Sequence, residues 1–538
     1  MSGACGYTHD VSGPRFDDLA CEEWTCGREP VEDRNRCAFH APPEVGDDAA
    51  RERLLEAVAE EAATVRLIGA RLGELSLDYT ILDGPSNHPV DLREATVTGE
   101  LSVRHATVDR PLRFEGATLA GAVDFEDTTF KRRVEFAEVD FDGTVSMQLA
   151  DFESWLDLGD ATFREQAYMR IARFRRGIFG VDATFERPAD FLNTRFDDIA
   201  NFYGAAFLDG AVFDNSTFEG NLAFIEATFE GPAVRLPSAR ESPQSPEAVF
   251  EGVALSVHGI VCRKNVRLTD ASLSGDVRFT EGHLASDLEC TGVSPAAGPV
   301  TVDCTGTETV GGTVSAAGGE VTYDLTEATV GELSVTDGSL DACRFDGTRF
   351  RGFDFGAYKR DLAAQGWRLH DEGLASEANP ERLENLYLRA KNGANAVGET
   401  RAAAEFFIRE MTYRRRGHRH RVVHGDGAGA RLRALGGWLS NAGLQASCGY
   451  GERPFRPVVA SGALVCAFTV VFAMLDAPVT YAEPLGYLVL STEGFVSLVL
   501  GLPEVSGTLV SFAVVSEAFL GGFAIALFVF TLTRSVSR

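Results

Sequence analysis

The most constraining feature of this 538-residue sequence is a register of apolar residues that runs through its middle. From Val97 to Phe229, apolar residues recur at alternating steps of six and five, and the register resumes unshifted after one gap at Gly180. Two residues before every second position stands a mostly small residue, as at Ala161 and Ala183. A repeat that keeps its phase over this length predicts stacked structural units that share one continuous core. The apolar positions are Val97, Val103, Val108, Phe114, Leu119, Phe125, Phe130, Phe136, Phe141, Met147, Phe152, Leu158, Phe163, Met169, Phe174, Phe185, Phe191, Phe196, Phe202, Phe207, Phe213, Phe218, Phe224 and Phe229.

The units of this repeat are expected to be strands rather than helices. A period of eleven residues also occurs in right-handed coiled coils. However, a step of five advances a helix by about 140°, so alternating steps would place the apolar residues on different sides of it. Val and Phe at the apolar positions, with Gly, Asp and Asn between them, favour short strands joined by turns.

The repeat resembles the pentapeptide-repeat family, in which a small and a polar residue precede a central Leu or Phe. The segments that carry this pattern are Ala161-Thr162-Phe163, Ala183-Thr184-Phe185 and Ala227-Thr228-Phe229. A strict five-residue spacing follows at Leu325, Val330, Val335, Leu340, Phe345, Phe350 and Phe355. The resemblance implies a mainly β fold, a right-handed quadrilateral β-helix whose central residues point inward.

This β-helix is expected over residues 65–356. Steps of five and six imply about 22 residues per coil, and coils stacked about 4.8 Å apart make the register about 30 Å long. A loop insertion is predicted near residues 236–247 and an irregular, Gly-rich stretch over residues 292–319. Cys262 and Cys290 fall in the register and are expected in the core. No nucleophile with a base or phosphate loop stands out in the sequence, so we expect a protein-interaction or regulatory module with an unknown partner, not an enzyme.

The N-terminal residues 1–45 are rich in cysteine and histidine. This leader contains Cys5, His9, Cys21, Cys26, Cys37 and His40. A structural zinc ion needs four nitrogen or sulfur ligands, and we predict Cys5, Cys26, Cys37 and His40, with Cys21 as an alternative to Cys26. The other interpretation is a disordered leader with reduced thiols. A helix is predicted over residues 46–64.

The charge composition narrows the choice of partner and source. The formal net charge of -29 argues against nucleic acid as a main partner, because like charges repel. Only four of the 50 basic residues are Lys, an acidic and Lys-poor balance that suits the cytoplasm of a halophile. The alternative is an acidic protein from an ordinary GC-rich genome. Met1–Asp10 has neither a basic start nor an apolar stretch, so the N-terminal part is expected in the reducing cytosol.

A helical connector is predicted over residues 357–447, where Ala, Glu, Leu and Arg dominate. Its residues 414–421 form a dense cationic run in an acidic chain. This run allows binding of nucleic acid or of anionic lipid headgroups, and its position just before an apolar segment favours the headgroups. The arginines of the run are Arg414, Arg415, Arg416, Arg419 and Arg421.

Residues 448–538 have the composition of a membrane domain. Pro457–Leu475 lacks charge and Val505–Thr533 contains only Glu517, so each is long enough to cross a bilayer. Between them, Pro484–Leu502 is expected to re-enter the membrane, because a third crossing would place the last arginines outside. The sequence therefore predicts a cell-membrane protein that contacts the lipid bilayer through two spans and has both termini in the cytoplasm.

This domain resembles two-transmembrane potassium channel subunits and the channel domains joined to pentapeptide repeats in archaeal proteins. The matching stretches are Cys448-Gly449-Tyr450-Gly451-Glu452-Arg453-Pro454, Ser516-Glu517-Ala518-Phe519-Leu520-Gly521-Gly522-Phe523 and Ala526-Leu527-Phe528-Val529-Phe530. Ser491-Thr492-Glu493-Gly494-Phe495 occupies the place of the family's filter. The resemblance implies a homo-oligomer, a tetramer if it forms a pore.

The filter departs from the family at one decisive position. A potassium filter uses a second Gly to turn its carbonyls toward the axis, and Val496 stands there instead. Three outcomes stay open: a less selective pore, a regulatory subunit or a non-conducting anchor. Glu517 is either functional or a packing hydrogen bond, and Gly521 and Gly522 either bend their helix or allow close contact.

Overall fold

The computed structural model describes the chain except for residues 1–3, 32–34, 43–46, 61–62, 85–86, 236–247, 251, 317–318, 370–378, 426 and 537–538. The chain divides into two compact units, Met1–Asp354 and Phe355–Arg538. The first unit is mainly β and the second is helical. The predicted fold class, a β-solenoid followed by helices, is confirmed.

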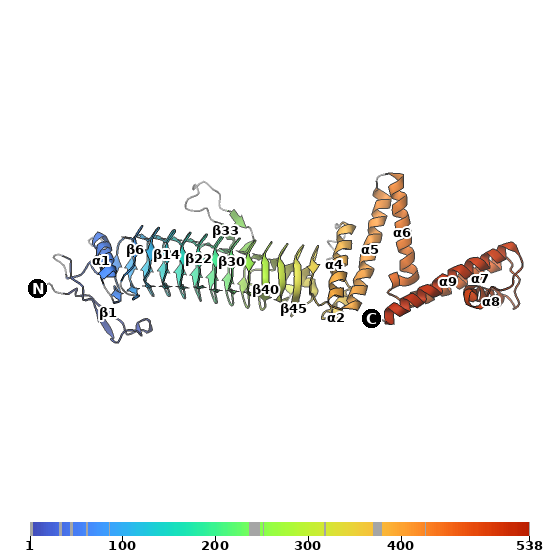
Figure 1. The fold of residues 1–538 in the computed structure, drawn as a ribbon, viewed down its shortest axis with the longest axis horizontal. Helices are drawn as coiled ribbons and strands as arrows, with labels where there is room; N and C mark the ends of the chain where they lie inside the picture. The colour runs from blue at the N-terminus through green and yellow to red at the C-terminus, as the bar shows by residue number, and fades with distance from the viewer. Residues whose placement is uncertain are drawn as a thin grey trace. The chain divides into compact units, whose positions relative to one another are not determined.

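The first unit is a solenoid of short parallel strands (Figure 1). Its strands run from β3 (Val65–Arg66) to β47 (Arg349–Phe350) and form parallel sheets of 21, 10 and 12 strands. The strands of the ten-stranded sheet are β4 (Arg71–Leu72), β8 (Thr96–Val97), β12 (Thr118–Leu119), β16 (Asp140–Phe141), β20 (Thr162–Phe163), β24 (Thr184–Phe185), β28 (Ala206–Phe207), β32 (Thr228–Phe229), β38 (Ser272–Leu273) and β41 (Ser294–Pro295). Each of these strands has only two residues, so the chain turns away from this face of the solenoid after one short strand.

The register of strand pairing confirms the coil length expected from the sequence. Phe141 pairs with Phe163, the residue 22 positions later, and this offset holds along the central coils. Toward the end of the solenoid the offset falls to 21 between Glu308 and Thr329 and to 20 between Thr329 and Arg349. The shorter coils coincide with the stretch of strict five-residue spacing.

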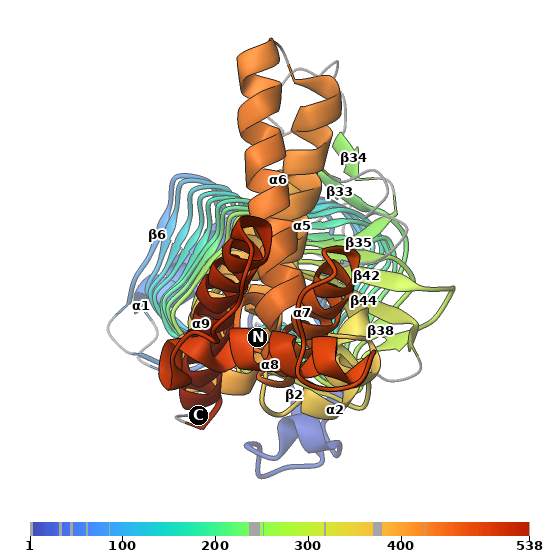
Figure 2. The same cartoon turned by 90° about the vertical axis from the view of Figure 1, so that its right-hand side faces the viewer.

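Phenylalanine rings from successive coils stack inside the solenoid. The ring centroids of Phe141 and Phe163 are 4.5 Å apart, and those of Phe163 and Phe185 are 4.6 Å apart, with ring planes within 9° of parallel. These distances match the strand spacing of about 4.8 Å, so the backbone ladder places each ring over the one before it. The coils lie behind one another as nested outlines (Figure 2). The core is therefore a set of continuous columns.

The gap in the register at Gly180 has a steric cause. A Cβ on Gly180 would come within 2.8 Å of Cδ1 of Phe202, which is fully buried in the next coil. The ring of Phe202 thus fills the space that a side chain at position 180 would need. Phe179, beside the gap, is only half-buried.

The small residues that precede every second apolar position are buried, as at Ala161 and Ala183. Where a serine or threonine occupies this position, its hydroxyl can donate to a backbone carbonyl of the previous coil. The Oγ1 of Thr194 donates to Met169 O at 2.7 Å. A buried hydroxyl without such a partner would cost stability. These small residues therefore lie inside the solenoid.

A residue with a left-handed backbone conformation recurs every eleven residues, at one type of corner of the solenoid. In the central coils, Ala161 N donates to Leu158 O at 3.1 Å and closes a turn around Asp160, whose φ is 55°. Glycine takes this place at Gly116 and Gly204. The other members of the series are Glu94, His105, Asp127, Glu138, Leu149, Ile171, Asp182, Asn193, Asn215 and Glu226. The eleven-residue repeat therefore consists of one such turn and one bend.

The last coils carry longer strands. These are β35 (Val253–Ser256), β40 (His283–Cys290), β42 (Val300–Asp303), β43 (Glu308–Ser315), β44 (Val321–Asp324) and β45 (Thr329–Thr336). Strands β41 to β43 occupy much of the stretch expected to be irregular. Cys262 and Cys290 are fully buried, as predicted. The predicted insertion near 236–247 lies outside the described residues, between the antiparallel pair β33 (Ala233–Arg235) and β34 (Ala248–Phe250).

Helix α1 (Asp47–Glu60) lies against the first coils and contacts β5 (Leu75–Ser76) and β6 (Ile81–Leu82). Its buried Leu54 and Val58 face the solenoid core. The guanidinium of Arg110, itself fully buried, donates to Val58 O at 2.9 Å and so satisfies a carbonyl near the end of the helix. The helix therefore covers apolar side chains that the first coil would otherwise expose.

The second unit begins with a helical connector, as predicted. Its helices are α2 (Lys359–Ala364), α4 (Pro380–Ala396), α5 (Thr400–His424) and α6 (Ala428–Cys448). Helices α4 and α5 pack closely, with the rings of Tyr387 and Tyr413 stacked at 5.5 Å. Lys391 Nζ reaches the buried Glu410 at 2.6 Å. This pair of helices has a core of its own.

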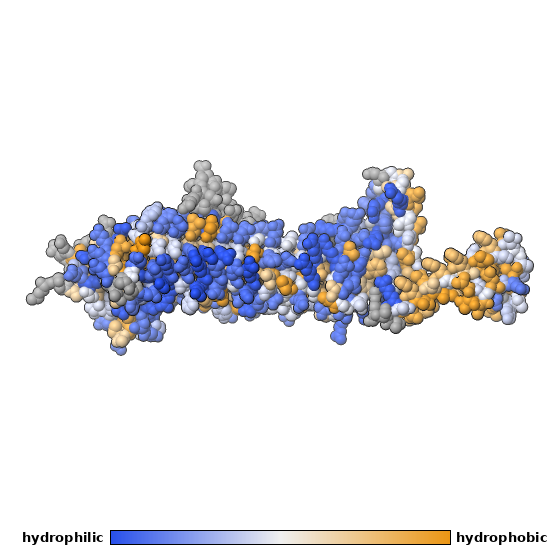
Figure 3. Space-filling model, in the orientation of Figure 1, coloured by the Kyte–Doolittle hydropathy of each residue, from blue (hydrophilic) through white to orange (hydrophobic). Residues whose placement is uncertain are grey.

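Three apolar helices follow: α7 (Phe455–Met474), α8 (Leu485–Leu500) and α9 (Thr508–Val536). Two of them, α7 and α9, are long and apolar enough to cross a membrane. In the most apolar 18-residue stretch of each helix, only 11% is buried in α7 and 28% in α9. The surfaces of these helices are largely apolar (Figure 3). Helix α8 has 16 residues, about 24 Å, and is shorter than the hydrocarbon core.

The residues with left-handed backbone at these corners predict opposite effects on stability for two substitutions that lie one coil apart. Ile171 holds a left-handed φ of 57° with its side chain 55% exposed, whereas Asn193 holds the same φ 22 residues later. We expect Ile171→Asn to raise the free energy of unfolding by about 1 kcal/mol and Asn193→Ile to lower it by a similar amount, because a β-branched residue strains this backbone. Thermal unfolding of the full chain, followed by its β-sheet circular dichroism, measures both. Equal shifts of the same sign would contradict the explanation.

Candidate metal centre

The leader brings four of its cysteine and histidine residues together. Strands β1 (Thr8–Asp10) and β2 (Glu23–Thr25) pair antiparallel and hold Cys5 and Cys26 near each other. Cys26 N donates to Tyr7 O at 3.0 Å. Cys37 and His40 lie in one tight turn, in which His40 N donates to Cys37 O at 3.1 Å. A spacing of three residues therefore points both side chains inward.

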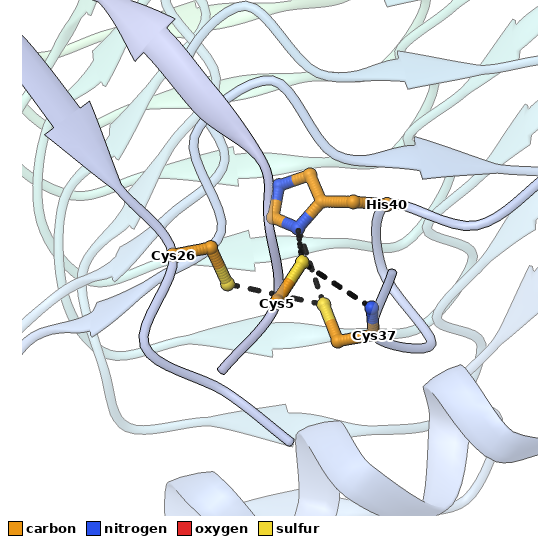
Figure 4. A group of neighbouring side chains, drawn as sticks. All are labelled: Cys5, Cys26, Cys37 and His40. Atoms are coloured by element: carbon orange, nitrogen blue, oxygen red, sulfur yellow. Dashed lines mark hydrogen bonds between the residues drawn. The ribbon is translucent and has the colours of Figure 1, made fainter. Parts of the chain in front are cut away.

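The ligand atoms of Cys5, Cys26, Cys37 and His40 all lie within 4.8 Å of one another (Figure 4). Nδ1 of His40 is 3.2 Å from Sγ of Cys37 and 3.9 Å from Sγ of Cys5. Sγ of Cys26 is 3.9 Å from Sγ of Cys37. For comparison, tetrahedral Zn–S bonds of about 2.3 Å separate their sulfur atoms by about 3.8 Å. The four side chains have the spacing of a tetrahedral metal site.

Surrounding groups orient these ligands. Nε2 of His40 lies 3.0 Å from Ile68 O, so a proton on Nε2 leaves Nδ1 free to bind a metal. The backbone N–H of Cys37 donates to Sγ of Cys5 at 3.3 Å, which holds this sulfur atom in place. The ring of Tyr7 stacks on that of His40 at 3.9 Å and 14°. These partners fix the ring before any metal binds.

Hydrogen bonding separates the Cys37 thiol from the cysteines of the solenoid core. All four residues of the cluster are buried. A hydrogen bond from Cys26, with a second contact from His40, lowers the pKa of the Cys37 thiol and so favours the thiolate that metals bind. In contrast, burial alone raises the pKa of Cys262 in the solenoid core. The core cysteines are packing residues.

The arrangement suits a structural rather than a catalytic ion. Four protein ligands fill a tetrahedral shell and leave no open position for a substrate. Cys21 is exposed and lies outside the cluster, so the structure selects Cys26 over it. His9 is used elsewhere, since its Nε2 lies 2.7 Å from the carboxylate of Glu94.

The leader is attached to the solenoid next to this cluster. Arg93, only 1% exposed, is paired with the buried Asp91 at 2.7 Å and with Asp18 of the leader at 2.7 Å. Its guanidinium also lies over the ring of Phe16 at 4.7 Å. Arg71 N, in the first coil, donates to Phe39 O at 2.7 Å, between the two ligands of the tight turn. A metal ion here would hold the leader on the first coil.

A scan against protein-family models matches the model described as pentapeptide repeats (9 copies) at residues 87–129, 181–228 and 191–240. The chain contains pentapeptide repeats. The first matched segment covers coils near the start of the solenoid, and the other two include coils with stacked rings, such as those of Phe196 and Phe218. Comparison with curated proteins finds no match. The pentapeptide repeats account for the solenoid and leave the leader and the helical unit to be explained by their own structure.

The filter-like residues of the apolar domain do not form an extended loop. Ser491, Thr492, Glu493, Gly494 and Phe495 all lie within helix α8. The structure thus has a helix at these residues, where the resemblance implies a filter. A single Gly costs a helix only about 1 kcal/mol, and tertiary packing of Ser491, Gly494 and Phe495 compensates for it. The helix ends instead at Gly501, where φ is 95°, ahead of Pro503.

Two of the predicted residues, Ser491 and Glu517, form a buried contact. Ser491 donates through its hydroxyl to the Oε1 of Glu517, and its Oγ also lies 2.9 Å from Val465 O. Glu517 is fully buried, and no protein partner of its Oε2 is found among the described residues. This oxygen faces Gly494, where a Cβ would come within 2.7 Å of it. The small residues of α8 make room for the carboxyl group.

The cationic run is only partly available to a surface. Arg414 is engaged within the connector, with its Nε 2.7 Å from Glu384 and an Nη 2.8 Å from Glu410. It therefore stabilises the α4–α5 pair. Arg416, Arg419 and Arg421 are exposed and Arg415 is half-exposed.

Two features of the candidate sites were missed by sequence reasoning. Tyr7, whose ring stacks on the ligand His40, stands two residues after Cys5, and its proximity to a ligand was the available signal. The pairing of Ser491 with Glu517 links residues 26 positions apart. Both residues were singled out, but no sequence pattern marks such a contact between helices.

The metal site predicts a clear separation between cysteine variants. We expect the purified chain to carry one metal ion and Cys37→Ser to lose it, because three ligands hold a structural ion poorly. Cys21→Ser is the matched control and should keep the ion, since Cys21 is exposed and outside the cluster. Elemental analysis of metal per chain measures both. Loss of metal in the control, or retention in Cys37→Ser, would refute the assignment.

The adjacent glycines of α9 predict unequal effects of the same substitution. A Cβ on Gly521 would run into the backbone carbonyl oxygen of Phe495 in α8, whereas one on Gly522 would meet the mobile end of the Leu498 side chain at 2.8 Å. We expect Gly521→Ala to destabilise the helical unit by about 1–3 kcal/mol, and Gly522→Ala by clearly less, because backbone cannot move aside. Thermal unfolding in detergent, followed by helical circular dichroism, compares them. A larger effect at Gly522 would show that α8 and α9 pack differently.

Proposed function

We propose that this protein is a membrane-anchored scaffold, in which the apolar helices hold the pentapeptide-repeat solenoid at a membrane for binding a protein partner. The observation that carries the proposal is the exposed apolar surface of α7 and α9. Phe512 and Phe519 of α9 are each 74% exposed, and Val459 of α7 is 73% exposed. Water solvates such a surface poorly, and lipid covers it at no cost.

Contacts within the helical unit support a hairpin with an even number of crossings. Arg534 near the end of α9 pairs with Glu452, just before α7, at 2.8 Å. The first span thus begins where the second span ends. Arg453 and Arg456 lie at the same end of the hairpin as Arg534. Arginines therefore flank the start of the first span and the end of the second. By the positive-inside tendency, this favours a cytoplasmic location for this end of the hairpin and for both termini.

The solenoid supports a binding rather than a catalytic role. Its interior is filled by stacked rings, so a partner can meet only its outer faces. These faces carry charged residues joined between coils, as in the pairs Arg175–Asp151 and Arg195–Glu219. A surface of this kind suits an extended protein partner rather than a small substrate.

We further propose that the leader holds a structural zinc ion. Three thiols and one imidazole in tetrahedral spacing are a donor set that favours zinc over magnesium or calcium. The ion would close the open N-terminal end of the solenoid by fixing the leader on the first coil. It has no part in substrate binding, because its ligand shell is complete.

A second candidate function is an oligomeric pore. Helix α8 favours it, since it is apolar, too short to cross a membrane and placed in the chain between two spans. A tetramer would have to supply the conducting path between subunits. Ion flux into liposomes that contain the purified chain tests this function, and flux that changes with Glu493→Gln would support the pore over the scaffold.

Two exposed cysteines provide a direct test of the anchor. Cys21 lies in the leader and Cys466 lies near the middle of α7, about 17 Å from its start. With membrane vesicles, we expect an impermeant maleimide to label Cys21 only when the cytoplasmic face is accessible. Cys466 should react only after detergent is added, because lipid shields it.

The variants Cys21→Ser and Cys466→Ser assign each labelled site. Reaction of Cys466 in intact vesicles from either side would contradict a span formed by α7. Release of the unlabelled chain from vesicles by alkaline carbonate would contradict anchoring altogether.

A further inference from the structure

Helix α6 carries an apolar stripe that the rest of the described helical unit leaves uncovered. Leu432, Leu435 and Leu439 are 71%, 39% and 56% exposed, and their spacing of three and four residues puts them on one side of the helix. Arg431 and Arg433, both exposed, flank this stripe on its two sides. An apolar stripe between cations is the pattern of a helix that lies in a membrane interface.

The charge around α6 points the same way. Between residues 411 and 451 the sequence contains seven Arg and a single acidic residue, Asp426, in a chain of net charge -29. The exposed arginines of α5 and α6 therefore form a cationic region that the rest of the sequence does not repeat. Anionic lipid headgroups are the complementary surface next to a membrane span.

The stripe continues into a groove between α6 and α7. The groove has a volume of about 660 Å³ and is mainly apolar. Small residues of α6 line one wall, and Phe455 and Val459 of α7, both strongly exposed, line the other. Arg456 contributes the charge at its edge. The small residues are Gly443 and Ala446, which follow Leu439 by four and seven positions and so lie on the same side of α6.

We propose that this groove binds an anionic phospholipid, with an acyl chain against the α6–α7 wall and the phosphate at Arg456. Nη1 of Arg456 donates to Gln445 O at 2.6 Å, which anchors the guanidinium and leaves other N–H groups for a phosphate. Helix α6 then lies in the headgroup layer. This inference rests on the proposed anchoring of α7.

A second copy of the chain fits this face less well. Symmetric pairing of two α6 helices through the leucine stripe would bring Arg431 and Arg433 of both copies close together. Like charges at an interface oppose association. An anionic lipid neutralises the same arginines, so lipid is the occupant that the charge pattern selects.

Trp438 on α6 gives a direct readout of the lipid. The full chain is incorporated into liposomes of phosphatidylcholine alone or with phosphatidylglycerol, and one lipid at a time carries bromine atoms on its acyl chains. The fluorescence of Trp438 is the difference between the wild-type protein and Trp438→Phe. We expect brominated phosphatidylglycerol to quench it more strongly than brominated phosphatidylcholine at equal content.

Matched variants test the groove itself. Arg456→Gln is expected to weaken the retention of phosphatidylglycerol about fivefold, since one cation near an anionic surface contributes about 1 kcal/mol. Arg401→Gln removes the same charge from the exposed first turn of α5 and should change little. Likewise, Leu439→Gln should reduce quenching more than Leu444→Gln, because Leu444 lies about 140° away around the helix. Native mass spectrometry of the detergent-solubilised chain measures the retained lipid.

The outcomes separate this inference from the proposed function. If the chain fails to enter liposomes and stays in the supernatant after flotation, the anchor itself is refuted. If it enters but Trp438 is quenched equally by both lipids, or Arg401→Gln acts like Arg456→Gln, the lipid site is overturned and the anchor stands. A chain that dimerises through α6 with no retained lipid also overturns it.

Discussion

The backbone ladder between successive coils is the constraint on which the solenoid depends. Each coil must place its strands about 4.8 Å above those of the coil before it, so neighbouring coils need nearly the same number of residues. In the central coils that number is 22, and it fixes which side chains lie above one another. The stacking of Phe163 on Phe185 follows from the ladder, because flat rings fill that spacing with few voids. The glycine at 180 and the buried hydroxyl of Thr194 are local adjustments to the same spacing.

A stacked ladder leaves an open end, and the leader with α1 closes the first one. A segment of about forty residues rich in Asp, Glu and Arg has too little apolar area to fold alone. It gains order from two sources, the four-ligand cluster and the ion pairs of the buried Arg93 with the first coils. The cluster and the solenoid therefore support each other: His40 takes its orientation from Ile68 O, and the first coil is covered because Cys37 and His40 hold the turn. The site is part of how the fold ends rather than a separate active centre.

Much of this could be predicted from the sequence because its signal is periodic. The ring positions, the coil of 22 residues and the buried small residues all follow from one register that tertiary contacts only confirm. The cluster of Cys5, Cys26, Cys37 and His40 could be predicted because the leader contains few other cysteine or histidine residues. Local sequence patterns do not specify contacts between distant segments. The engagement of Arg414 by Glu384 and the helix through Glu493 and Gly494 depend on neighbours that no local pattern specifies.

The apolar helices differ from the arrangement that the resemblance to channels implies. A carbonyl filter requires backbone oxygens that are free of helical hydrogen bonds and directed at an ion. In α8 the backbone oxygens are used within the helix, and its end at Gly501 leaves a different segment, residues 501–507, non-helical. Meanwhile the carboxyl group of Glu517 is held by Ser491 inside the unit, where small residues leave room for it. A buried polar pair of this kind fixes how α8 packs on α9, since separating the helices would leave both groups unsatisfied in an apolar surrounding. The geometry therefore accounts for the close packing of α8 on α9 within the helical unit.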